Sequence, residues 1–177
     1  MFETVVNLDL ASDDLYVRHQ RVAALFSRDR QAERDYQFSV GGGALYLRSP
    51  QRRVNLDGWR EMRAAEGGRR YAISGVARID SARLAPKLRA TWRLPPVLQG
   101  IVARWFDGAG AMEDLTVSPG TALPMSKPGQ ATLLWTPIHF TGMLLVKDQA
   151  EALRIQQQGV GRGRGFGFGC VHFQEAA

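Results

Sequence analysis

A run of alternating glycines near the end of the chain restricts its fold more than any other feature. Residues 156–173 read QQQGVGRGRGFGFGCVHF, with glycine at every second position from 159 to 169. The preceding residues, 148–158, predict a helix capped by Asp148, and 169–173 predict a strand. A glycine-rich linker would join two domains, but only a short strand follows here. The run therefore predicts a loop attached to a sheet.

Two nucleotide-binding motifs are excluded by the glycine spacing. G-x-G-x-x-G needs glycines at i, i+2 and i+5, and glycines that occupy only odd positions never satisfy i+5. The Walker loop is excluded because no G-K-[ST] is present. RGFGF at 164–168 fits the start of the RNP1 stretch of an RNA-recognition motif. However, Val171 replaces its last aromatic residue, and too little chain remains for the helix and strand that should follow.

The interpretation that we favour is an anion-binding loop. Glycines let backbone N–H groups approach a phosphate closely, and Arg162 and Arg164 add charge-assisted contacts. The formal net charge is +6, and 20 of the 23 basic residues are arginine. Arginine suits phosphate contacts and stacking on bases, so the charge favours nucleic acid first and an anionic membrane second. A basic protein without such a partner is the alternative.

The order of the expected elements indicates an α+β fold with two tandem ferredoxin-like (βαββαβ), RRM-like halves and antiparallel sheets. For the first half, residues 1–80, we expect strands at 2–10, 35–40, 44–49 and 69–79, and helices at 13–30 and 56–68. Ser12 is expected to cap the first helix, with Asp13 and Asp14 in its first turn.

The second half, residues 81–177, begins with a basic connector at 82–96. A helix at 95–108, a hairpin at 120–135 and a strand at 138–148 are expected before the glycine run. The first strand of this half is missing from the pattern. The strand at 69–79 is therefore either shared between the halves or reassigned to the second one.

The remaining composition limits the chemistry and the compartment. Cys170 is the single cysteine, which excludes an internal disulfide and a cysteine-based zinc site. The N-terminus lacks the pattern of a signal peptide, and no apolar run approaches the roughly 18–20 residues of a membrane span. We expect a cytoplasmic protein with no membrane partner.

Residues 140–173 resemble a known family. Their strand, helix, GVGRGRGFGFG loop and terminal strand are similar to the glycine-rich signature of the RAMP superfamily of CRISPR-associated proteins. Within it, they resemble the repeat-processing endoribonucleases called Cas six, especially the type I-E branch. The first helix of that branch carries a tyrosine and, three residues later, a histidine, and LYVRH supplies Tyr16 and His19 at this spacing. A type IV relative is the alternative subtype.

The resemblance implies a metal-independent, site-specific endoribonuclease that cleaves CRISPR precursor RNA within the repeat stem-loop. No cofactor is expected. The RNA 2′-OH would attack the adjacent phosphate, with His19 as general acid/base and Tyr16 as its positioning partner. The expected RNA-binding residues are Gly159, Gly161, Arg162, Gly163, Arg164 and Gly165 of the loop, with Lys127, Arg18 and Arg21. The expected partners are the repeat or guide RNA, on which the enzyme would remain, and the subunits of a multi-protein CRISPR effector complex.

Other interpretations remain open at this point. His19 shares an apolar stripe with Leu15 and Val22, which by itself favours a core histidine bonded to a backbone carbonyl. A non-catalytic RNA-binding subunit of the same superfamily is therefore one alternative, and a general basic RNA-binding module is another. His139 and His172 are interpreted as structural or surface-facing, and Glu113 and Asp114 as helix-end charges.

Overall fold

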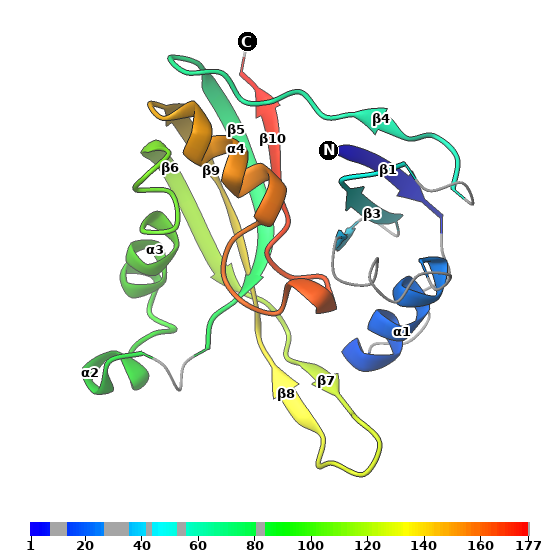
Figure 1. The fold of residues 1–177 in the computed structure, drawn as a ribbon. Coiled ribbons are helices and arrows are strands. Elements are labelled where there is room, and N and C mark those ends of the chain that lie inside the picture. The colour runs from blue at the N-terminus through cyan, green and yellow to red at the C-terminus, as the bar shows by residue number, and fades with distance from the viewer. Residues whose placement is uncertain (8–13, 27–35, 42–43, 53–55, 81–83, 177) are drawn as a thin grey trace.

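The described residues form two four-stranded antiparallel sheets, and the first is built from the N-terminal part of the chain (Figure 1). The structure is a computed structural model that describes residues 1–7, 14–26, 36–41, 44–52, 56–80 and 84–176. The strands of the first sheet are β1 (Phe2–Val6), β2 (Gln37–Gly41), β3 (Ala44–Ser49) and β4 (Arg60–Glu61). Their spatial order is β2-β3-β1-β4, and helix α1 (Leu15–Leu25) packs against this sheet.

The second sheet contains the remaining long strands. They are β5 (Arg70–Arg78), β6 (Gly110–Pro119), β9 (Pro137–Val146) and β10 (Val171–Glu175), in the spatial order β10-β5-β9-β6. Helices α3 (Pro95–Ala103) and α4 (Gln149–Gln158) connect them as β5-α3-β6-β9-α4-β10. This is the βαββαβ order of a ferredoxin-like unit. The predicted fold class, α+β with two antiparallel ferredoxin-like halves, is confirmed.

Strand β5 belongs to the second sheet. All nine of its residues pair with β9, and Tyr71–Gly75 also pair with β10. Ile73 and Ala77 are buried in the same core as α3 and α4. The strand expected at 69–79 is therefore the missing first strand of the second half, and the expected boundary at residue 80 separates β5 from its own sheet.

The prediction of a helix at 56–68 is wrong. The segment contains only the short strand β4, and its backbone bonds to distant elements. Met62 N donates to Met1 O at 3.1 Å, Ala65 N donates to Gln156 Oε1 at 2.9 Å, and Arg63 O accepts from Gln156 Nε2 at 3.2 Å. The chain is extended here because it crosses from the first sheet to the second (Figure 1), so tertiary bonds replace those of a helix.

The strand β6 was not expected from the sequence. Glu113 and Asp114, which were interpreted as helix-end charges, lie on it at a β-bulge where the register with β9 shifts between Glu113 and Thr116. Asp114 has a φ of 49°. The bulge interrupts the alternation of apolar and polar residues, which is the pattern that indicates a strand.

The second half has two further features. The short helix α2 (Pro86–Arg89) lies in the basic connector, and the expected hairpin forms from β7 (Leu123–Met125) and β8 (Leu133–Trp135). The hairpin projects from the end of the second sheet (Figure 1). No helix among the described residues is long and apolar enough to cross a membrane.

Each half has its own apolar core. Val22 and Phe26 of α1 pack against Phe38, Leu45 and Leu47 of the first sheet. The second core lies between the second sheet and its helices, and includes Ile73, Leu98, Val102, Phe140, Leu144 and Ile155. Apolar burial stabilises both cores, and a smaller cluster of Leu15, Met125 and Phe168 packs α1 against the second half.

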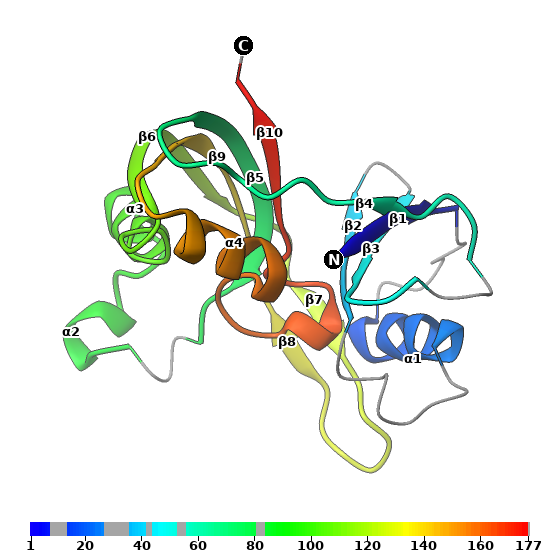
Figure 2. The ribbon, with the colours of Figure 1, turned by 45° about the horizontal axis from the view of Figure 1, so that its top comes forward.

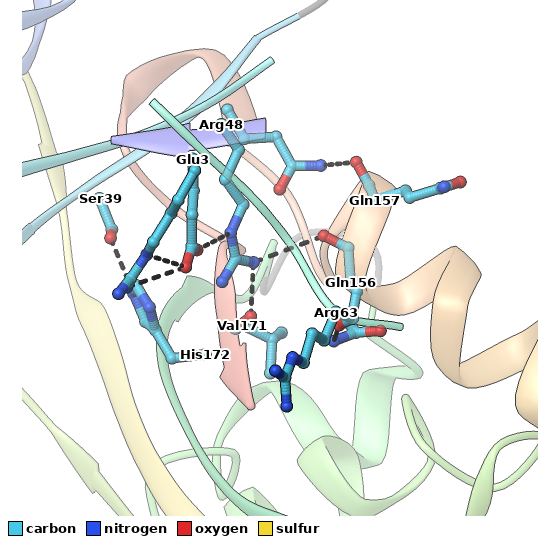
Figure 3. Close-up of polar contacts among 10 residues, drawn as sticks. Glu3, Ser39, Arg48, Arg63, Gln156, Gln157, Val171 and His172 are labelled. Carbon is cyan, nitrogen blue, oxygen red and sulfur yellow. Dashed lines mark hydrogen bonds and ion pairs between the residues drawn. The ribbon is translucent and has the colours of Figure 1, made fainter. Parts of the chain in front are cut away.

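Polar side chains join the two halves (Figure 3). Arg48 of β3 is buried and donates to Val171 O at 2.6 Å, and its Nε lies 3.5 Å from a carboxylate oxygen of Glu3. His172 Nε2 lies 3.0 Å from Ser39 Oγ. A cavity of about 390 Å³ between the sheets is lined by Ser39, Tyr46, Ser74, Thr141, His139 and His172, among others.

Candidate active site

Helix α1 begins with a side-chain cap. Asp14 is the N-cap, and its carboxylate accepts from the backbone N–H of Tyr16 at 2.8 Å and of Val17 at 3.3 Å. Asp14 therefore caps the helix instead of lying in its first turn, and Ser12, the expected cap, lies outside the described residues. Leu15 and Val22 are buried as predicted, and His19 is half-buried. The core position that the apolar stripe favoured for His19 is therefore wrong, whereas the bond to a backbone carbonyl that went with it is present, to Gly165 O.

The glycine run folds into a closed loop. Val160 N donates to Gly169 O at 2.8 Å, and Gly169 N donates to Val76 O of β5 at 2.6 Å. The positive φ angles of Gly159, Gly161, Gly163, Gly167 and Gly169 require glycine. A Cβ at Gly163, for example, would also lie only 2.9 Å from the Phe168 ring. The backbone of the loop itself therefore explains these glycines.

Gly165 differs from the other glycines of the loop and lies beside His19. Its φ is not positive, and a Cβ there would meet only the His19 ring, at 3.9 Å. Its carbonyl oxygen lies 2.5 Å from His19 Nδ1. Because a carbonyl only accepts, Nδ1 carries the proton and donates it to this hydrogen bond. Figure 2 shows the short 3₁₀ helix η3 (Arg164–Phe166) next to α1.

Aromatic side chains hold the loop against α1 and the hairpin. The Phe166 ring centroid lies 4.9 Å from that of His19 and 5.1 Å from that of Trp135. Phe168 is buried with Leu15 and Met125. Phe166 and Phe168 therefore pack within the protein, unlike the exposed base-stacking aromatics of an RNP1 sequence.

The whole chain has the fold of CRISPR proteins of known structure. It aligns with Cas6e from Escherichia coli K-12 (19% identity, 98% of each chain, TM-score 0.68) and with Thermus thermophilus Cse3 bound to an RNA representing a pre-cleavage complex (16%, 98% of each, 0.65). A chain of a CRISPR RNA-guided surveillance complex aligns over 99% of this chain and 100% of its own (19%, 0.74). The family described as CRISPR associated protein matches residues 100–172. No curated protein sequence matches the chain.

The chain has the Cas6e fold. The family match covers the glycine loop and most of the second half, and the structural alignments cover 98–99% of this chain. The resemblance seen in the sequence is thus confirmed.

The arginines of this Cas6e-like loop have different surroundings. Arg164 is exposed, and its guanidinium donates to Gln158 O at the end of α4 at 2.6 Å. Arg162 is also exposed, and within the described part of the chain it forms no side-chain hydrogen bond or ion pair. Arg162 is therefore better placed than Arg164 to bind an external anion.

A third arginine, Arg78, was not predicted from the sequence to belong to the site. It ends β5, its guanidinium lies 3.9 Å from the Trp135 ring centroid, and its carbonyl accepts from Arg162 N at 3.3 Å. Burial lowers the pKa of Arg78, opposed by the nearby Asp80 carboxylate, and the charge of Arg162 lowers it further. The sequence of β5 contains no signal for this position, because the contact joins residues far apart in the chain.

The other predicted residues lie on two elements. Tyr16 is half-buried and packs against the cluster of Leu15, Met125 and Phe168, and no hydrogen bond joins Tyr16 to His19 among the described residues. Arg18 of α1 lines a cavity of about 310 Å³ with Phe166 and His139, while Arg21 is exposed. Lys127 is half-buried in the turn of the hairpin, where its carbonyl accepts from Gln130 N.

The remaining histidines lie on the sheet face between the halves. His139 is exposed on β9, and His172 is bonded to Ser39, so their interpretation as surface-facing and structural is confirmed. Burial, with the nearby Arg48 charge, lowers the pKa of His172 from 6.5 to about 4. Among the described residues, no group of three or more His, Cys, Asp or Glu side chains could hold a metal ion.

Proposed function

We propose that this protein is a metal-independent endoribonuclease that cleaves CRISPR precursor RNA within the repeat stem-loop. The observation that carries the proposal is the 2.5 Å contact between His19 Nδ1 and the Gly165 carbonyl. This contact joins the helix that bears the candidate general acid/base to the loop that bears Arg162 and Arg164. His19 and Gly165 are 146 positions apart in the chain. The similarity to RNA-bound Cse3 supports RNA as the substrate.

The geometry supports proton transfer by His19. With Nδ1–H donating to Gly165 O, the neutral ring presents Nε2 as its acceptor. Nε2 would take the proton of the RNA 2′-OH as that oxygen attacks the adjacent phosphate, or, from the imidazolium, protonate the leaving 5′-oxygen. Tyr16 lies one turn away on the same helix and forms no hydrogen bond with His19 among the described residues, so it would help to position the RNA and not the histidine. The products would carry a 2′,3′-cyclic phosphate and a 5′-hydroxyl.

The glycine loop would hold the RNA backbone. Arg162 would contact a phosphate, and Arg164, Arg18, Arg21 and Lys127 would add positive charge around the loop. After cleavage the protein would remain on its product and join a multi-protein CRISPR effector complex, as the similarity to a chain of a surveillance complex suggests. A non-catalytic RNA-binding subunit is the second candidate, but the half-exposed His19 beside the loop favours the enzyme.

The test is cleavage of a repeat stem-loop RNA in excess EDTA, followed on a denaturing gel. We expect one cut that survives EDTA, because the 2′-OH of the RNA is the nucleophile. A 2′-deoxy nucleotide at the scissile position should block the cut without preventing binding. Loss of cleavage in EDTA with recovery on adding magnesium would contradict the mechanism, and intact but shifted RNA in a native gel would support the binding subunit.

A further inference from the structure

We propose that Arg78 and Arg162 together bind one phosphate of the RNA backbone, so that the RNA site extends from the glycine loop onto the end of β5. The proposal rests on the proposed function, because it takes RNA as the ligand. It adds a residue that lies outside the glycine run and on a strand of the sheet.

The backbone places the two side chains together. Arg78 and Arg162 form an isolated antiparallel bridge, in which Arg162 N donates to Arg78 O at 3.3 Å. Residues paired in this way direct their side chains to the same face, with Cβ atoms about 5 Å apart. A Cβ at the neighbouring Gly161 would meet the Arg78 carbonyl oxygen at 3.2 Å and the Trp105 ring at 3.4 Å. The two guanidinium groups therefore leave the bridge in the same direction.

This pair concentrates positive charge. Among the described residues, neither Arg78 nor Arg162 forms an ion pair within 4.0 Å. Partial burial lowers the pKa of Arg78, the Asp80 carboxylate raises it, and the charge of Arg162 lowers it further. Like charges at paired positions destabilise a sheet. An anion bound between the two guanidinium groups would attract both of them and so offset their repulsion. Two oxygens of one phosphate fit the planar N–H donors of arginine.

Trp135 orients Arg78 toward this position. The guanidinium lies 3.9 Å from the Trp135 ring centroid, within the range of a cation–π contact. Trp135 in turn packs against Phe166 at 5.1 Å, and Phe166 packs against His19 at 4.9 Å. A continuous line of side chains thus connects Arg78 to His19. A phosphate held by Arg78 and Arg162 would fix the RNA backbone relative to the histidine.

The salt dependence of binding tests the proposal. The probe is a fluorescent repeat stem-loop RNA with 2′-deoxy nucleotides around the cleavage site, titrated at several salt concentrations. One neutralised phosphate contributes about −0.7 to the slope of log K against log salt in a single strand and about −0.9 in a duplex. Arg78→Ala should therefore flatten the slope by about 0.7–0.9, and Arg162→Ala should do the same. The double variant should lose no more than either single one, because the phosphate is shared.

Matched variants control for packing. Arg93→Ala removes an exposed arginine that lies 4.8 Å from the Trp92 ring centroid in the connector, and it should leave the slope unchanged. Arg78→Gln keeps a planar side chain over Trp135 and tests the charge if Arg78→Ala does not fold. Trp135→Phe should retain most of the affinity, whereas Trp135→Leu should weaken binding.

The outcomes are distinguishable. Wild-type protein that does not bind the stem-loop overturns the proposed function and this proposal with it. Binding by the wild type, with an unchanged slope in folded Arg78→Ala or Arg78→Gln, overturns this proposal alone. Slope losses that add in the double variant would show two separate phosphates and would also overturn it.

Discussion

At the residue scale, the surroundings of His19 in the structure differ from those that its sequence position predicts. Its position in an apolar stripe favours burial, yet it lies half-exposed at the edge of the helix, with Nδ1 bonded to Gly165 O and its ring beside Phe166. A backbone carbonyl holds the ring in one orientation and selects the Nδ1–H tautomer. This arrangement leaves Nε2 for proton transfer and links its orientation to the fold of the loop.

We expect His19→Ala to slow cleavage by at least about 10²-fold, because a positioned acid/base contributes about that much or more. RNA affinity should change little, since proton transfer does not contribute to binding. Single-turnover cleavage and equilibrium binding of the same RNA measure the two effects. Tyr16→Phe should slow cleavage less, because the ring is kept. His139→Ala, which removes an exposed histidine between the halves, is the control. A folded His19→Ala protein that cleaves at the wild-type rate would end the assignment.

At the scale of the elements, Asp14 connects α1 to the hairpin. One carboxylate oxygen caps α1, and the other accepts from Ser126 N of the hairpin at 3.1 Å. Hydrogen bonding from Ser126, and then from the backbone of Tyr16 and Val17, lowers the pKa of Asp14 below its usual 3.8. The helix that carries His19 is therefore fixed at its first turn to an element 112 residues away.

We expect Asp14→Ala to lower the free energy of unfolding by about 1 kcal/mol, the usual value of an N-cap. Since the folded pKa of Asp14 lies below its unfolded value, its contribution is present above about pH 3.8 and is lost as the pH falls through the folded pKa. Urea unfolding at neutral and acidic pH measures both effects. Asp14→Asn should keep the cap at neutral pH and remove the Asp14 part of the acid dependence. Equal stability of Asp14→Ala and the wild type at neutral pH would contradict this role.

At the scale of the whole molecule, the two larger cores meet through polar contacts between the sheets and through a smaller apolar cluster of Leu15, Met125 and Phe168. Arg48, Glu3, Ser39 and His172 lie between the sheets (Figure 3), where Arg48 donates to Val171 O and His172 is bonded to Ser39. The alignment of the halves matters for the site, because α1 belongs to the first half and the glycine loop to the second. The contact between His19 and Gly165 therefore crosses from one half to the other and depends on how the halves are aligned.

The stability of the whole protein should fall as the pH drops from about 6.5 to about 4. His172 has a folded pKa near 4 and an ordinary value of 6.5. Between these values the unfolded chain binds the extra proton, so the free energy of unfolding rises with pH. The shift corresponds to roughly 3 kcal/mol between the two limits.

Replacing His172 with Asn should flatten this pH dependence, whatever it does to stability at neutral pH. Urea unfolding across the range from pH 4 to pH 7 measures the slope. His139→Asn, at an exposed position on the same sheet face, should leave the slope unchanged. An equal slope in the wild type and His172→Asn would show that His172 is not responsible.

Local physical chemistry explains what could be predicted from the sequence. The stripe of Leu15 and Val22 indicates α1, Asp148 caps α4, with its carboxylate accepting from Glu151 N at 3.0 Å, and prolines begin α3. Each of these signals involves residues only a few positions apart. At that range, the spacing in the sequence fixes where the side chains lie on the helix. The glycine run likewise indicated a loop between α4 and the last strand, attached to the sheet.

The tertiary structure alone decided the features that depend on distant partners. Residues 56–68 are extended because Gln156 and Met1 supply their hydrogen-bond partners, and β5 enters the second sheet because β9 and β10 pair with both of its edges. The contacts of His19 with Gly165 and of Arg78 with Arg162 likewise join segments that no local spacing relates. The sequence by itself determined which side chains could serve the site, and the packing of the two halves determined which of them meet.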